Sequence, residues 1–183
     1  MIYLVRHAHA DWSPDEQRPL SAKGREDALR VAELLATYSI SVIYSSPYAR
    51  ARQTVEPLAA RLSLPIIEHH DLRERQLSGE PVDDFLSTVK TLWENPTFAF
   101  PGGESNVEAQ KRGAAVIQTL TEKHANEQII IATHGNLLAL MLQHFNPSLD
   151  FTFWQNMTLP DAYGLKLSTL HEYTIERFWK EKI

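Results

Sequence analysis

Two histidines and two arginines stand close behind apolar runs of the sequence. Arg6 and His7 directly follow the first run. Arg50 lies within one helical turn of the end of a second run, and His134 follows the end of a third. An imidazole can act as a nucleophile or a proton carrier, and planar guanidinium groups bind phosphate or carboxylate through paired hydrogen bonds. Brought together, these four side chains would form a site for an anion at which a histidine performs the chemistry.

The three apolar runs, residues 2–5, 40–44 and 128–133, have the composition of strands buried on both faces. Parallel strands end at the same edge of a sheet, and ligands of open α/β sheets bind beyond that edge. Helices that begin after these strands direct their N-terminal partial positive charges to the same place. The order of elements therefore predicts that the two histidines and two arginines surround one crevice.

Helices are predicted between the strands. Ser21 is suited to cap a helix whose apolar residues recur to Leu35, and Ser46-Pro47 is suited to begin a helix with the proline in its first position. The second helix continues to about residue 62, further helices are expected over 82–93, 104–124 and from about residue 136, and further strands over 64–67, 163–167 and 171–178. Strands alternating with helices predict an α/β fold, a three-layer α/β/α sandwich around a mainly parallel sheet.

The length of 183 residues suits one well-buried domain, residues 1–183, and no composition shift suggests a linker. Residues 68–103 are irregular and long for a simple connection, so we expect them to form a cap that selects the substrate. Apolar side chains of that segment are candidates for a pocket wall: Phe85, Leu92, Trp93, Phe98 and Phe100.

The composition narrows the classes of function. The formal net charge of −5 argues against an electrostatic nucleic-acid binder or a polybasic membrane surface. The absence of cysteine excludes disulfides, thiolate nucleophiles and cysteine-ligated metals. The first apolar run is too short for a signal peptide or a membrane span. We therefore expect a cytoplasmic protein with neither nucleic-acid nor membrane partners.

Five motifs in order resemble those of the histidine phosphatase superfamily, and more narrowly its phosphoglycerate mutase-like branch. They span residues 4 to 136, most of the chain, and their shared order is far more specific than any one of them. The motifs are Leu4-Val5-Arg6-His7-Ala8, Ser45-Ser46-Pro47-Tyr48-Ala49-Arg50-Ala51-Arg52-Gln53-Thr54, Leu72-Arg73-Glu74-Arg75, Pro101-Gly102-Gly103-Glu104-Ser105 and Thr133-His134-Gly135-Asn136.

The resemblance implies a phosphoglycerate mutase-like fold, a phosphatase activity on small phosphorylated metabolites, and a role for each matching residue. His7 matches the histidine that is phosphorylated, and Glu74 matches the carboxylate that acts as acid and base. Arg6, Arg50 and His134 match the rest of the phosphate pocket. No metal or other cofactor is implied, because the ring of positive groups takes the place of a divalent cation.

Two positions depart from the family pattern, and a glycine supports it. Ala8 stands where the family usually has glycine, as also happens in small phosphatases of the family. Ser13 stands where asparagine is common, and its hydroxyl group could still bind a phosphate oxygen. Gly135 has no Cβ and would let the main chain approach a ligand closely.

The expected mechanism sets the protonation states. His7 must be neutral to attack phosphorus, and the nearby arginines disfavour its protonation. A protonated His134 would stabilise the transferred group, and Glu74 would protonate the leaving alkoxide and then activate water. Taken without the family, Glu74 would instead be an ion-pair partner of Arg73 or Arg75, although in an extended segment these arginines point away from its face.

Other functions stay open at this stage. A mutase would need a second anion site, for which residues 75–103 offer only Arg75 and Lys90 among several carboxylates. A metallohydrolase could draw ligands from His7-Ala8-His9, Asp11, His69-His70 and His134, but its commonest fold, an eight-stranded barrel, needs a longer chain. A phosphohistidine-protein phosphatase or a non-catalytic phosphate-binding module would use the same pocket. The substrate and the oligomeric state are not determined.

Overall fold

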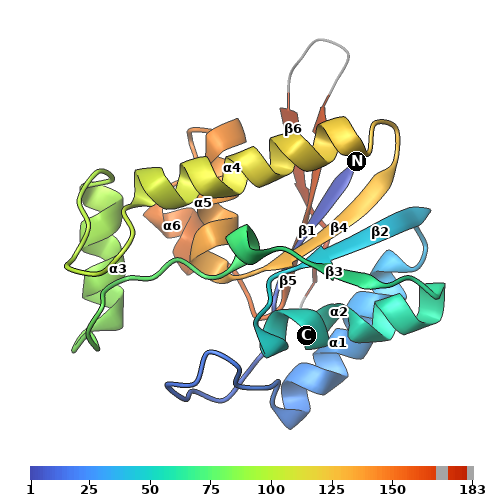
Figure 1. Cartoon of the computed structure of the whole chain (residues 1–183), viewed down its shortest axis with the longest axis horizontal. Coiled ribbons are helices and arrows are strands. Elements are labelled where there is room, and N and C mark those ends of the chain that lie inside the picture. Colours follow the sequence, from blue (N-terminus) through green and yellow to red (C-terminus); the bar gives the residue numbers. More distant parts are fainter. Residues whose placement is uncertain (168–172, 181–183) are drawn as a thin grey trace.

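The computed structural model describes residues 1–167 and 173–180. The strands are β1 (Ile2–Arg6), β2 (Ile40–Ser45), β3 (Ile66–Glu68), β4 (Gln128–Thr133), β5 (Asp161–Leu167) and β6 (Tyr173–Arg177). The helices are α1 (Ala22–Leu35), α2 (Ala49–Leu62), the short 3₁₀ helix η1 (His70–Leu72), α3 (Phe85–Glu94), α4 (Asn106–Lys123), α5 (Gly135–Phe145) and α6 (Phe151–Gln155). Within the described residues the strands form one sheet in the order β3-β2-β4-β1-β5-β6 (Figure 1).

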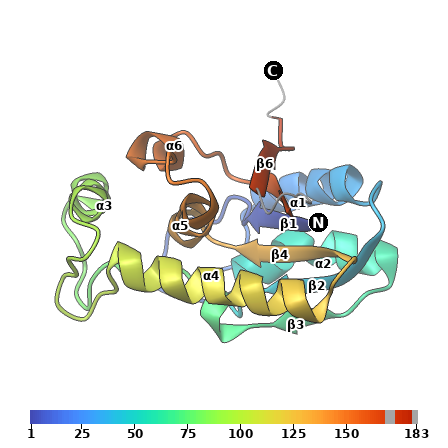
Figure 2. The same cartoon turned by 90° about the horizontal axis from the view of Figure 1, so that it is seen from above.

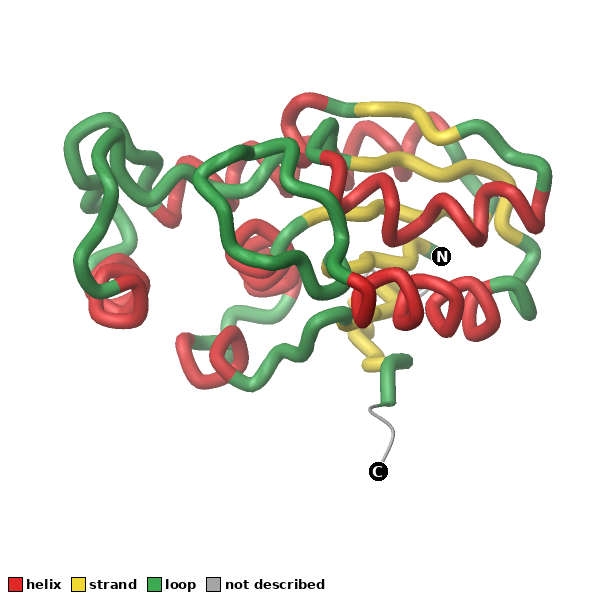
Figure 3. The backbone as a smooth tube through the Cα atoms, turned by 90° about the horizontal axis from the view of Figure 1, so that it is seen from below, coloured by secondary structure: helices red, strands yellow, loops and turns green. Residues whose placement is uncertain are grey.

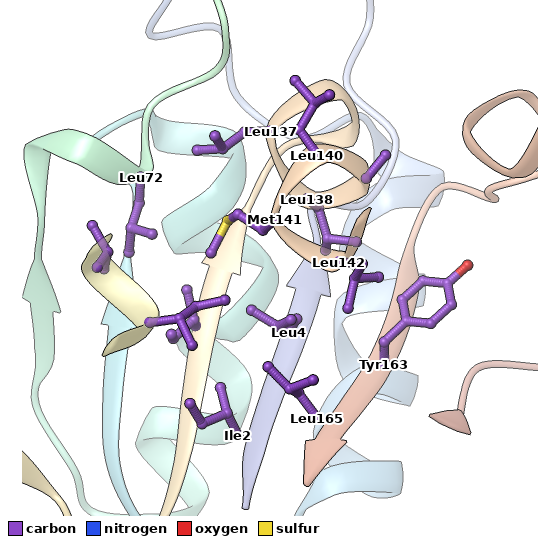
Figure 4. Packing of buried hydrophobic residues seen from close by; sticks show 14 of the residues in the cluster. Ile2, Leu4, Leu72, Leu137, Leu138, Leu140, Met141, Leu142, Tyr163 and Leu165 are labelled. Atoms are coloured by element: carbon purple, nitrogen blue, oxygen red, sulfur yellow. The ribbon is translucent and has the colours of Figure 1, made fainter. Parts of the chain in front are cut away.

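Helices cover both faces of the sheet because its central strands are apolar on both sides. In β1, Ile2 and Leu4 pack with α4 and α5, whereas Tyr3 and Val5 pack with α1 and α2. Figure 4 shows the first of these clusters, with leucines of α5 facing Leu4. Strands β1, β2, β3 and β4 are parallel, and β5 and β6 are antiparallel to their neighbours. The predicted three-layer α/β/α architecture with a mainly parallel sheet is confirmed.

Long connections gather beyond one end of the strands, whereas mostly short turns lie beyond the other (Figure 3). Three of the long connections cover residues 7–21, 73–84 and 95–105. The last two flank α3, which lies at one end of the molecule (Figure 2). These loops border the carboxyl ends of the parallel strands, where the sequence predicts the crevice.

Several predicted element boundaries are wrong, and local capping explains two of them, at α3 and α4. Helix α2 begins at Ala49 rather than Pro47, because Tyr48 is still extended. Asp84 caps α3, which therefore begins later than predicted, and Ser105 forms a capping box with Glu108 at the start of α4. Strand β3 is shifted to Ile66–Glu68, and η1 and α6 were not predicted. Of the predicted strand 171–178, residues 171 and 172 lie outside the described part of the chain, and the rest corresponds to β6 and Phe178.

The first helix is pressed against the segment that follows β1. A Cβ atom on Gly24 would lie 2.0 Å from the carbonyl oxygen of His9, so only glycine permits this approach. The Ser21 side chain caps α1, and the Ser21 main-chain N–H donates to the same His9 carbonyl at 3.0 Å. Helix α1 thereby fixes the chain just beyond His7. None of the helices in the described ranges is both long and apolar enough to cross a membrane.

Candidate active site

The strand register brings the ends of β1, β2 and β4 together. Arg6 is paired with Thr133 in the parallel ladder, and the His7 N–H donates to the Thr133 carbonyl at 3.0 Å. On the other side of β4, the Ser46 N–H donates to the Ala132 carbonyl at 2.9 Å. The predicted crevice therefore lies at the carboxyl ends of three adjacent strands.

His7 is held with one ring nitrogen free of a proton. Its Nδ1 lies 2.7 Å from the Ala8 carbonyl oxygen, to which it can only donate. The Nε group of Arg50 donates to His7 Nε2 at 3.3 Å, which places the lone pair on that atom. Burial, and to a smaller extent Arg50 and Arg6, lower the pKa of His7 to about 3, against the opposing effect of the Ala8 hydrogen bond. The ring is therefore neutral and nucleophilic at Nε2 near neutral pH.

Arg50 comes from the first turn of α2 and is 4% exposed. Its Nη1 donates to the Glu16 carbonyl oxygen at 2.9 Å, and its guanidinium carbon lies 5.0 Å from the centre of the Tyr48 ring. Burial and, to a smaller extent, repulsion from Arg18 lower the pKa of Arg50 to about 10. Arg50 is still positively charged at neutral pH and directed at the nucleophile.

Arg6 is held by main-chain oxygens. Its Nη1 donates to the carbonyls of Met157 at 2.9 Å and Thr158 at 3.2 Å, while its Nε is buried with no partner among the described residues. A Cβ on Gly135 would lie 2.8 Å from the Arg6 guanidinium, so glycine is needed for this close packing. Gly135, which was expected to let the main chain approach a ligand, thus makes room for a side chain of the protein.

His134 is fully buried between His7 and Tyr48. The centre of its ring lies 5.1 Å from the ring of each. Its Nε2 lies 2.8 Å from Ser46 Oγ, and its Nδ1 is buried without a partner among the described residues. Burial lowers the pKa of His134 well below its ordinary value, with smaller effects from His7 and Arg50. The expectation of a protonated His134 does not hold for this structure, because burial disfavours the charge.

Glu74 reaches the N-terminus of α5. Its Oε2 accepts from the Asn136 N–H at 3.2 Å, and its Oε1 accepts from the Leu137 N–H at 3.1 Å. The flanking arginines are engaged elsewhere: Arg73 pairs with Asp71, and Arg75 donates to the Asn106 side chain. Within the described ranges no ion pair joins Glu74 to either arginine. The carboxylate is therefore oriented by the helix terminus at the rim of the crevice.

Ser13 takes no direct part in the described pocket. Its hydroxyl accepts from the Asp15 N–H at 3.1 Å, and its carbonyl oxygen accepts from Arg18 Nη1 at 3.1 Å. Ser13 instead shapes the loop that presents Arg18. That guanidinium, within the described chain, donates only to the main-chain oxygens of Ser13 and Asp15.

A pocket of about 520 Å³ adjoins this site: Arg50 and Glu74 line it, whereas Arg6, His7 and His134 are not among its lining residues. Four arginines and four glutamates line it in all. The glutamates already have partners: Glu74 at α5, Glu104 with Arg112, Glu108 with Ser105 and Glu16 with Tyr48. The arginines are Arg18, Arg50, Arg73 and Arg75. Arg18 and Arg73 were not predicted as site residues, and neither was Tyr48, whose pKa burial and the Glu16 contact raise to about 12. No local pattern marks a loop arginine such as Arg18.

The pocket wall differs from the expected apolar one. The segment 68–103 contributes polar residues and glycines to the wall, among them Gln76, Gly102 and Gly103. None of the five predicted apolar side chains lines the pocket. Leu92 is buried in the core, whereas Phe98 is 43% exposed and packs on Phe100. Of the segment 68–103, residues 73–76 and the Gly102-Gly103 turn reach the pocket, whereas helix α3 and residues 95–100 do not line it.

The candidate metal ligands are dispersed. His9 Nδ1 lies 2.8 Å from Ser21 Oγ at the cap of α1. His70 contacts Arg73 at the protein surface. Across residues 1–167 and 173–180, no three histidine, aspartate or glutamate side chains are grouped so that they could hold a metal ion.

Comparisons with known proteins agree with this fold. The model of the histidine phosphatase superfamily (branch 1) matches residues 2–179. Phosphoglycerate mutase-like protein 4 of Arabidopsis thaliana is 31% identical over 164 residues, which cover 80% of this chain and 71% of that protein. The uncharacterized phosphatase PhoE of Bacillus subtilis is 26% identical over 170 residues, covering 86% and 85%. The solved structure of a mycobacterial glucosyl-3-phosphoglycerate phosphatase has a TM-score of 0.79 at 20% identity, with 97% of each chain covered.

Proposed function

Because this chain belongs to the histidine phosphatase superfamily and is a phosphatase of that type, we propose that it hydrolyses phosphate monoesters through a phosphohistidine on His7. The observation that carries the proposal is the pair of contacts made by the His7 ring. Nδ1 is tied to the Ala8 carbonyl, and Nε2 keeps a lone pair next to Arg50. A neutral imidazole fixed beside a cation is the arrangement that a phosphoryl acceptor needs.

In the first step Nε2 of His7 attacks phosphorus while the bond from phosphorus to the leaving alkoxide oxygen breaks. Arg6 and Arg50 stabilise the equatorial oxygens, and Arg18 at the mouth adds a third guanidinium. When Nε2 of His134 accepts a hydrogen bond from Ser46, the ring proton lies on Nδ1. The neutral ring can then donate a hydrogen bond from Nδ1 to the transferred phosphoryl group. No metal or organic cofactor takes part.

Glu74 moves the protons. In its protonated form it gives a proton to the leaving alkoxide, and as a carboxylate it then takes one from the water that attacks phosphohistidine. The position of Glu74 at the pocket wall, next to the start of α5, supports this role. The second step returns His7 to its neutral form and releases inorganic phosphate.

The substrate class is a small phosphorylated metabolite. A pocket of about 520 Å³ suits such a molecule. The similar mycobacterial protein is named for glucosyl-3-phosphoglycerate, and PhoE is named only as a phosphatase. We assign residues 68–103 to substrate selection, since they contribute Gln76 and Gly102 to the pocket.

A phosphoglycerate mutase is the second candidate, favoured by Arg18 and Arg73 at the pocket mouth. These two arginines could hold the carboxylate that a mutase must bind. Glu16 in the same wall disfavours a second anion. Nuclear magnetic resonance of the products from 3-phosphoglycerate separates the two activities, because a mutase yields the 2-isomer and a phosphatase yields glycerate and phosphate.

The test is phosphate release from a library of phosphorylated metabolites with a chelator present, together with trapping of the phosphoenzyme by an alkaline denaturing quench, because phosphohistidine is labile in acid and stable in alkali. We expect turnover of at least one monoester, unchanged by the chelator, and a trapped phosphate that disappears in His7→Ala. The matched control, His144→Ala, changes an exposed histidine of α5 and should retain the trapped phosphate. A phosphoenzyme that persists in His7→Ala would refute the assignment. Tight phosphoprotein binding without hydrolysis would favour a binding module.

A further inference from the structure

The turn that holds Arg6 is itself fixed by a buried carboxylate. The Arg6 guanidinium depends on the carbonyl groups of Met157 and Thr158, which lie in the connection between α6 and β5. Main-chain oxygens can orient a guanidinium only if their own positions are fixed. The next residue of regular structure is Asp161, the first residue of β5, which is paired with Arg6 in the antiparallel β1–β5 ladder.

Asp161 is completely buried, and both of its oxygens are used. Oδ2 accepts from the Thr158 N–H at 3.0 Å and from the Tyr163 hydroxyl at 3.0 Å. Oδ1 accepts from the Ala162 N–H at 3.0 Å. The bond to Thr158 is the important one, because the Thr158 N–H belongs to the same peptide unit as the Met157 carbonyl that binds Arg6.

Arg177 of the edge strand β6 completes the unit with two parallel hydrogen bonds. Its Nε donates to Asp161 Oδ1 and its Nη2 to Asp161 Oδ2, each at 2.8 Å. The same Nη2 donates to Thr158 Oγ1 at 3.0 Å, and that hydroxyl donates to the Pro160 carbonyl at 2.6 Å. A buried carboxylate compensated in this way is strongly constrained, and so is the turn attached to it.

We propose that Asp161 is a positioning residue for phosphate binding, acting through the 157–160 turn on the Arg6 guanidinium. The inference rests on the proposed role of Arg6 in the phosphate pocket. Asp161 is linked to Arg6 through the turn, because it accepts from the Thr158 N–H while the Met157 and Thr158 carbonyls accept from Arg6. Its charge also lies close enough to Arg6 to oppose the lowering of the Arg6 pKa by burial.

A double-mutant cycle tests this inference, with calorimetric binding of inorganic phosphate as the measurement. Asp161→Asn keeps the shape of the side chain but removes its charge and gives it a donor where acceptors are needed. We expect the dissociation constant of phosphate to rise by about tenfold or more in the wild-type background, as expected when a binding group is misplaced. In an Arg6→Ala background the same substitution should change it by less than about twofold.

A role confined to folding predicts a different pattern. An equal loss of affinity in both backgrounds would overturn the proposal, because Asp161 would then act on the pocket without Arg6. Asp27→Asn is the matched control: Asp27 is also a buried carboxylate, 3% exposed, and is paired with Lys23 and Arg30 in α1. This change should lower the thermal midpoint and leave phosphate affinity unaltered in both backgrounds.

Thr158→Val covers the case in which Asp161→Asn does not fold. It removes the hydroxyl that ties the turn to Pro160 and Arg177, but it keeps the ion pair between the buried Asp161 and Arg177. We expect weaker phosphate binding that again disappears in the Arg6→Ala background, and unchanged affinity would overturn the proposal. The proposed function is tested independently of this inference. If the wild-type protein bound phosphate but formed no phosphoenzyme, hydrolysis through phosphohistidine would be refuted. The double-mutant cycle of phosphate binding would still decide the role of Asp161.

Discussion

The Nε atom of Arg50 lies 3.3 Å from Nε2 of His7, so a permanent cation donates a hydrogen bond to the nitrogen that we assign as nucleophile. The contact keeps the ring neutral and marks where a phosphate oxygen would replace Nε2 as the acceptor. Arg50 can therefore hold the imidazole before the substrate arrives and hold the phosphate afterwards.

Acid should destabilise the folded protein through the half-buried His7 and the fully buried His134. The pKa of His7 falls from 6.5 to about 3 on folding, and that of His134 is also lowered. Below pH 6.5 the unfolded chain therefore binds protons that the folded chain does not, so the free energy of unfolding falls as the pH falls. The slope is about 1.4 kcal/mol per pH unit for each proton taken up.

Urea unfolding from pH 7 to pH 4.5 measures this slope. Because carboxylates also titrate in acid, the informative quantity is the difference between the wild-type slope and those of His7→Asn and His134→Asn. Both variants should show a shallower slope. A slope unaltered by either substitution would mean that these imidazoles titrate normally.

Glu74→Gln should separate substrates by their leaving groups. Alkyl phosphates need a proton donor, so their kcat should fall by about 10²–10⁴-fold, whereas p-nitrophenyl phosphate should lose far less. Steady-state kinetics on both substrates provides the measurement. Glu80→Gln changes an exposed carboxylate in the same segment and should affect neither. Equal losses on the two substrates would exclude Glu74 as the acid.

Gly135→Ala should weaken substrate binding with little loss of stability. The new Cβ would lie 2.8 Å from the guanidinium of Arg6, the far end of a flexible side chain that can move away. We expect KM to rise by about tenfold or more as the guanidinium is displaced. In an Arg6→Ala background the added methyl group should cause no further loss. A further rise in KM in the Arg6→Ala background would mean that the methyl group acts on the main chain of α5 rather than on Arg6.

Arg18→Gln should raise KM and weaken phosphate inhibition by about fivefold to tenfold, since the pocket loses a guanidinium with no carboxylate partner in the described chain. Arg25→Gln alters an exposed arginine of α1 and provides the control for net charge. Inhibition by inorganic phosphate at fixed pH distinguishes the two. Identical behaviour of both variants would remove Arg18 from the site.

Much of the site could be predicted because its residues are tied to strand ends. Arg6, His7 and His134 follow buried strands directly, and Arg50 lies in the first turn of the next helix. Parallel pairing of those strands leaves little freedom in where such residues can lie. The element boundaries were less predictable, because capping contacts such as Gln17 Oε1 at the start of α2 come from distant loops.

The sequence alone determined the mainly parallel sheet, the family, and the residues that gather at the edge of the sheet. Hydrophobic periodicity and the order of motifs can be read directly along the chain, without knowledge of its fold. Only the tertiary structure decided that Ser13 shapes a loop, that Arg18 enters the pocket, and that Arg6 is held by a turn 151 positions away. These arrangements depend on main-chain carbonyl groups, which every residue possesses, and on loop paths that distant contacts select. No residue type signals them in advance.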